Sequence, residues 1–180
     1  MGDLPATDAP GVYAVSLSSN PLDNGGLLPK ASINEARVRA WMDRVSAFCF
    51  RGRLNPDPAE VAEVLNEFWL PDENIVYIGK ATCIRKRLDQ LYRHKLGNRS
   101  PHAGGHWLKT LFNLGELYIH YCTCPTADTA ERKEDEALAA FKAQVSARWR
   151  RRIQNAISFA TRAHPAGFPK QREIRNDVLS

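Results

Sequence analysis

Residues 74–87 bring together side-chain types that are suited to phosphate chemistry. The segment opens with an apolar, β-branched run over residues 75–78, which predicts a strand that stops near Gly79. A stretch rich in Arg and Lys follows over residues 83–94 and is predicted to form a helix. Tyr77 then lies at the end of the strand, with Lys80 and Arg87 just beyond it. A phenol beside two cations is a combination that can bind and polarise a phosphate group.

A second strand of similar character is predicted near the start of the chain. Residues 11–17 are rich in strand formers and begin with Gly11-Val12-Tyr13. Downstream, Tyr77 is followed by Ile-Gly and, ten residues after the tyrosine, by Arg87. Either tripeptide alone is common by chance, whereas the ordered pair with the arginine at this offset is specific. In these features the chain resembles the GIY-YIG nuclease family over residues 11–17 and 74–145.

The resemblance implies a small, central, three-stranded antiparallel sheet flanked by helices. It implies that Tyr77 is the general base, that Tyr13 is its partner in the site and that Arg87 contacts the phosphate. Lys80, three residues after Tyr77, is expected to favour the phenolate, since free tyrosine has a pKa of about 10. One divalent ion, Mg²⁺ or Mn²⁺, is expected on a glutamate of a later helix, and Glu134 is the candidate.

The choice of Glu134 rests on the pattern of a helix predicted over residues 126–145. The acidic residues in its first turns are Glu131, Glu134, Asp135 and Glu136. In the family that the chain resembles, this glutamate is followed by apolar positions three or four and then seven residues later. From Glu134 these positions carry Ala137, Leu138 and Phe141, whereas from Glu136 they carry only alanines, which are small but possible. Because such positions share one helical face, Glu134 is predicted to lie at the edge of the buried stripe. The alternative is that all four acids only complement the positive N-terminal end of the helix.

Two further groups of residues are expected to contact the substrate. His102 and His106 flank a glycine-rich loop near the expected site, with simple loop packing as the alternative. The basic cluster is defined as Arg148, Arg150, Arg151 and Arg152. Residues 146–180 hold eight basic and two acidic residues, a net charge of +6, and the rest of the chain sums to −1. A cationic segment attracts polyanions, which predicts nucleic acid as the partner, with a solvated basic helix as the alternative.

The chain is predicted to form a single domain over residues 1–180 of the α/β class. Strands are expected over residues 11–17, 75–78 and 116–124, and helices over 34–48, from 58 onward, 83–94, 107–112, 126–145 and 146–162. Residues 18–73 form a helical insertion between the first two strands and are expected to add specificity or a homodimer contact. Residues 146–180 form the basic C-terminal helix and tail.

The composition and the first residues of the chain indicate where in the cell the protein is expected. Apolar residues make up 43% of the 180 residues and charged residues 25%, as in globular proteins. No apolar run approaches the length of a membrane span, and the first residues lack the basic and apolar regions of a signal peptide. A cytoplasmic protein is therefore expected.

The expected function is that of a metal-dependent endonuclease that hydrolyses phosphodiester bonds. Nucleic acid is the expected substrate, DNA before RNA. The alternative is a nucleic-acid-binding module whose nuclease site has decayed or been repurposed. One departure from the family concerns its late asparagine, for which Thr161 and Asn155 are both candidate replacements.

Overall fold

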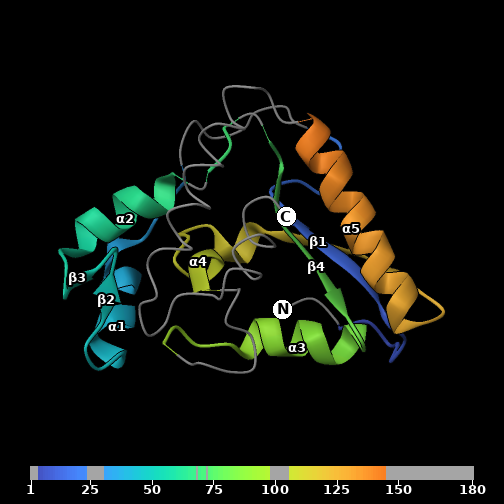
Figure 1. Ribbon diagram of the computed structural model, residues 1–180, viewed down its shortest axis with the longest axis horizontal. Coiled ribbons are helices and arrows are strands. Elements are labelled where there is room, and N and C mark those ends of the chain that lie inside the picture. Colours follow the sequence, from blue (N-terminus) through green and yellow to red (C-terminus); the bar gives the residue numbers. More distant parts are fainter. Residues whose placement is uncertain (1–3, 24–30, 68, 72, 98–105, 145–180) are drawn as a thin grey trace.

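The computed structural model describes residues 4–23, 31–67, 69–71, 73–97 and 106–144 (Figure 1). The predictions that concern His102, the basic cluster, Asn155, Thr161 and the helix over residues 146–162 lie outside the described residues. Within the described ranges, no helix combines the length and the apolar character that crossing a membrane requires.

A three-stranded antiparallel sheet forms the centre of the fold. Its strands are β1 (Gly11–Ser16), β4 (Ile75–Ala81) and β5 (Tyr118–Thr123), in the spatial order β4-β1-β5. In this register Tyr13 lies opposite Gly79 on one side and opposite Tyr121 on the other. The described chain is therefore an α/β protein with a three-stranded antiparallel sheet and flanking helices, which confirms the predicted fold class at this level.

Helix α3 (Ile84–Arg93) follows β4 almost directly, so that it starts beside the sheet end where β4 stops. Its buried residues recur at spacings of three and four: Ile84, Leu88 and Leu91. This spacing places them on one helical face against the core. Arg85, Lys86 and Arg93 are exposed on the rest of the helix surface, whereas Arg87 is partly buried.

Helix α5 (Ala127–Gln144) packs along the sheet. Its buried stripe consists of Ala130, Glu134, Leu138 and Phe141. A glutamate therefore occupies a position on the buried face of the helix, where an apolar residue is expected. In Figure 1 helix α5 lies on one side of the sheet, and the elements of the insertion lie on the other.

The insertion between β1 and β4 contains the two predicted helices and a hairpin that was not predicted. The helices are α1 (Glu35–Arg44) and α2 (Pro58–Asn66), and the hairpin pairs β2 (Cys49–Phe50) with β3 (Arg53–Leu54). Arg51 and Gly52 connect the two strands with φ angles of 54° and 72°. A two-residue turn with both φ angles positive favours Asn-Gly, so Arg-Gly gave only a weak hairpin signal.

The insertion is joined to the segment that contains α4 (His106–Lys109) and the 3₁₀ helix η2 (Leu114–Glu116). The ring of Trp41 stacks on His106 with centroids 5.2 Å apart. The amide of Asn34 donates to the carbonyl of Thr110 at 2.7 Å. These contacts make the insertion part of the same core as the sheet.

Candidate active site

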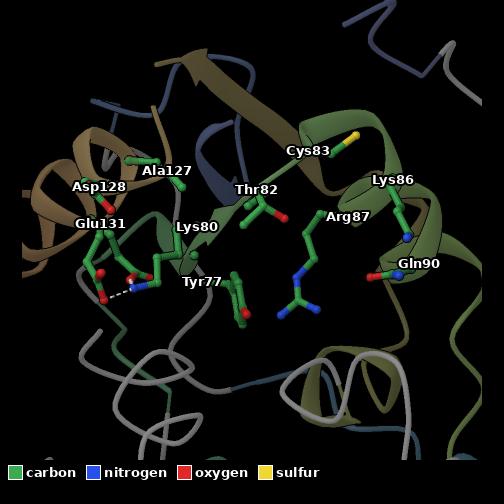
Figure 2. Close-up of a pocket in the computed structure, with 14 residues that line it drawn as sticks. Tyr77, Lys80, Thr82, Cys83, Lys86, Arg87, Gln90, Ala127, Asp128 and Glu131 are labelled. Atoms are coloured by element: carbon green, nitrogen blue, oxygen red, sulfur yellow. Dashed lines mark hydrogen bonds and ion pairs between the residues drawn. The ribbon is translucent and has the colours of Figure 1, made fainter. Parts of the chain in front are cut away.

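A cavity of about 490 Å³ opens beside β4, where the sheet meets α3 and α5 (Figure 2). Its walls carry side chains from three elements: Tyr77, Gly79 and Lys80 of β4, Lys86, Arg87 and Gln90 of α3, and Asp128, Glu131 and Glu134 of α5. The wall from α5 is therefore acidic and the wall from α3 is basic. In Figure 2, Tyr77 lies between these two walls.

The two tyrosines that the sequence singled out meet at this cavity. Their rings stack with centroids 5.6 Å apart and an interplanar angle of 24°. The hydroxyl of Tyr13 donates to the hydroxyl of Tyr77 over 3.4 Å. Both residues are buried, but Tyr77 lines the cavity, and Tyr13 lies beneath it on the neighbouring strand. Tyr77 is therefore the phenol that a bound molecule reaches first.

Gly79 allows the two rings to come together. It pairs with Tyr13 across the strands, so a side chain at this position would point into the space between the rings. A Cβ added there would lie 2.8 Å from Cε1 of Tyr77 and 3.0 Å from Cζ of Tyr13. Real Cβ atoms do not approach ring atoms this closely, so the glycine of the motif is a steric requirement of the tyrosine pair.

Arg87 supplies the cation that contacts the tyrosines. Burial works to lower the pKa of Arg87, but interaction with the hydroxyl groups of Tyr13 and then Tyr77 raises it above its usual value. Figure 2 shows the guanidinium extending from α3 toward Tyr77 and the open part of the cavity. The spacing of ten residues between Tyr77 and Arg87 thus places the pair in one cluster.

Glu134 is the buried carboxylate of the α5 wall. Only 3% of the residue is exposed, and within the described part of the chain no donor reaches its Oε1 atom. Burial raises the pKa of Glu134, and the ammonium of Lys80 acts in the opposite direction. Glu131 and Glu136 are exposed, so the predicted position of Glu134 at the buried stripe of α5 is confirmed.

Lys80 contacts the acidic wall. Its Nζ forms an ion pair with Glu131 and lies 3.5 Å from Oε2 of Glu134. Side chains alternate along a strand, so Lys80 and Tyr77 leave β4 on opposite faces. Lys80 was expected to contact the phenol of Tyr77, but it contacts the carboxylates of Glu131 and Glu134 instead. The cation in contact with the phenols is Arg87.

His106 is placed in the core and not on the cavity wall. It is 2% exposed, stacks on Trp41, and its Nε2 lies 3.3 Å from Nε2 of His94. Burial, with the charges of His106, Lys109 and Arg87, lowers the pKa of His94 to about 4. The expected substrate contact of His106 is therefore replaced by packing, the alternative that the sequence left open.

Comparisons with models of protein families, with curated proteins and with solved structures found no match for this chain. The chemistry of the cavity is accordingly argued from its own side chains.

Several cavity residues were not anticipated as site residues. Lys86 and Gln90 line the basic wall beside Arg87. Lys86 and Gln90 are four residues apart on a predicted helix and therefore share one face beside Arg87, so they could have been predicted from the sequence. Glu131 was considered only as a metal ligand, and its ion pair with Lys80 depends on how α5 packs against the sheet. That packing is not encoded in any local pattern.

Proposed function

We propose that this protein is a metal-dependent endonuclease of the GIY-YIG type that hydrolyses phosphodiester bonds in nucleic acid, with DNA as the expected form. The observation that carries the proposal is that Tyr77, Arg87 and a buried carboxylate, Glu134, line one open cavity, with Tyr13 stacked on Tyr77 beneath it. Hydrolysis of a phosphodiester needs a base for the attacking water and positive charge for the phosphate. The cavity contains groups for both tasks.

Tyr77 is the proposed general base. A phenol takes a proton from water only if its anion is stabilised. The Tyr77 oxygen accepts a hydrogen bond from Tyr13 and interacts with the guanidinium of Arg87. Tyr13 stabilises a negative charge on that oxygen by its hydrogen bond, and Arg87 does so by hydrogen bonding and by its positive charge.

Arg87, Lys86 and Gln90 are the proposed phosphate contacts. A guanidinium can donate two parallel hydrogen bonds to phosphate oxygens, which fixes the orientation of the group as well as binding it. Lys86 and Gln90 lie on the same wall of the cavity and extend its polar surface away from Tyr77. The basic cluster of the C-terminal segment is proposed to add sequence-independent attraction for the polyanion.

Glu134 is the proposed ligand of one Mg²⁺ or Mn²⁺ ion. Its unpartnered, buried Oε1 is the kind of hard donor that such ions prefer. Among the described residues no cluster of three His, Cys, Asp or Glu side chains could hold an ion alone. Mg²⁺ commonly uses one or two protein carboxylates and completes its shell with water and substrate phosphate, so Glu134 could be its protein ligand. When bound, the ion would supply positive charge to the phosphate and the leaving oxygen.

The proposal is tested by incubating the full chain with supercoiled plasmid in Mg²⁺ and, in parallel, in EDTA. Cleavage of the plasmid is expected in Mg²⁺ and not in EDTA. Glu134→Gln should abolish it and keep nucleic-acid binding, while Glu136→Gln, the same charge change at an exposed position of α5, should cleave normally. Cleavage that persists in EDTA, or in Glu134→Gln, would contradict a metal-dependent site at this carboxylate.

A second candidate, binding of nucleic acid without cleavage, is favoured by the contacts of Lys80. Its ammonium already lies against Glu131 and Glu134, so it compensates much of the negative charge that would attract a divalent ion. Mobility-shift binding with no cleavage of duplex, branched or single-stranded substrates in Mg²⁺ or Mn²⁺ would select this candidate.

A further inference from the structure

The acidic wall of the cavity contains a lysine that competes for the proposed metal ligand. The ammonium of Lys80 and a divalent ion both require the carboxylate of Glu134, whose Oε2 lies 3.5 Å from Nζ. Two cations cannot share one carboxylate at close range without mutual repulsion. The position of Lys80 therefore bears directly on the affinity of Glu134 for a metal ion.

Glu131 determines that position. It lies one helical turn before Glu134, so both carboxylates are on the same side of α5 and face the cavity. Lys80 forms its closer ion pair with Glu131, and only a longer contact with Glu134. The Oε1 atom of Glu134 is left without a donor from the described residues. Lys80 is thus drawn toward the exposed rim of the cavity, and the buried carboxylate keeps one oxygen available.

We propose that Glu131 is a positioning residue that draws the ammonium of Lys80 toward itself, limits its pairing with Glu134 and thereby keeps one oxygen of Glu134 open to a divalent cation. The inference rests on the proposed function, because it assumes that Glu134 binds the ion. Without the Glu131 carboxylate, the ammonium of Lys80 would be free to pair fully with Glu134, the nearest remaining carboxylate in its ion-pair network. The metal ion would then have to displace it.

The test measures Mn²⁺ binding to the full chain at pH 8, without nucleic acid, by electron paramagnetic resonance of the free ion. Glu131→Gln is expected to weaken Mn²⁺ binding by about three- to fivefold, the upper end of the range for a partly exposed ion pair. The matched control is Glu136→Gln, which removes the same charge from the exposed face of α5 and should leave the affinity unchanged. An equal loss in both variants would mean a general charge effect and would overturn the positioning role.

A double-mutant cycle separates an effect through Lys80 from direct attraction between Glu131 and the ion. In a Lys80→Met background no ammonium competes for Glu134, so Glu131→Gln should change Mn²⁺ affinity by less than about twofold. An undiminished effect in that background, or no effect of Glu131→Gln in the unmodified chain, would overturn the positioning role alone. If the unmodified chain and Glu134→Gln bind Mn²⁺ equally, the metal ligand itself is wrong, and both the proposed function and the inference fail.

Discussion

At the residue scale, the site consists of groups whose buried positions cost stability. Glu134 is the clearest example, because a carboxylate that is 3% exposed loses its hydration and has one oxygen without a donor among the described residues. Lys80 offsets only part of this cost, since the pKa of Glu134 stays above its usual value. This cost is consistent with the proposed role of Glu134 as a metal ligand, because perturbed ionisable groups cluster at functional sites.

We predict that Glu134→Gln raises the melting temperature at pH 7. A carboxyl group with a raised pKa in the folded state is destabilising once both states are ionised, that is, above its folded pKa. Below the ordinary value of 4.5 the carboxyl group is protonated in both states, so the difference between variant and parent should largely vanish there. Thermal melts at pH 7 and pH 4 measure this. A lower melting temperature for Glu134→Gln at pH 7 would contradict the account of its burial.

His94 is predicted to make stability depend on pH. Its pKa is lowered from 6.5 to about 4, so between these values the unfolded chain binds a proton that the folded chain does not. Stability is therefore fully present above pH 6.5 and falls as the pH drops toward 4, by at most about 3 kcal/mol. Urea unfolding at pH 7.5 and pH 5 should show the loss, and His94→Leu should flatten it. An equally steep pH dependence in the variant would assign the effect to other groups.

At the scale of elements, β4 is the strand that positions the central residues of the cavity. It contributes Tyr77 to one face and Lys80 to the other, and its glycine creates the space in which the tyrosines of two strands meet. The strand pairing of β4 with β1 survives an insertion of two helices and a hairpin. Asn74 helps to close it, since its side chain accepts from the amide of Leu17 and donates to the carbonyl of Asn20.

Gly79→Ala is predicted to destabilise the fold and to remove cleavage. The added methyl group would lie 2.8 Å from a ring carbon of Tyr77, and overpacking of this kind costs about 1–3 kcal/mol. Thermal melts and plasmid cleavage measure the two effects. Gly115→Ala is the control, because a Cβ at that position meets nothing within 4 Å. Unchanged cleavage by Gly79→Ala would show that the tyrosine pair is not needed in its present geometry.

The elements also show what could be predicted from the sequence and what could not. The local patterns predicted the strands that carry Tyr13 and Tyr77 and the helix that carries Arg87, because β-strand alternation and helical periodicity fix local direction. That these three residues share one site was predicted from the family resemblance. Glu134 was selected by the helical stripe together with the pattern expected of the family's glutamate. The partner of Lys80 and the burial of His106 depend on how distant elements pack, and no local pattern reports that.

At the scale of the whole molecule, the uneven distribution of charge is the feature that bears on the proposed nucleic-acid substrate. The described site contains both signs, whereas the net positive charge of the chain resides in residues 146–180, which lie outside the described ranges. We predict that replacing the four arginines of the basic cluster with alanine weakens binding to all DNA sequences alike. The log–log salt dependence of binding should flatten by roughly 0.9 per lost phosphate contact. An unchanged slope would make the cluster a solvated surface.

The central claim is that Tyr77 is the general base of a phosphodiester hydrolase. The most direct measurement is the initial rate of Mg²⁺-dependent plasmid cleavage by the unmodified chain and by Tyr77→Phe, with melting temperature and DNA affinity recorded for both. Phenylalanine keeps the stacked ring and removes only the hydroxyl, so the rate should fall by about 10² or more while melting temperature and affinity stay nearly the same. A Tyr77→Phe protein that cleaves at the full rate would contradict the claim.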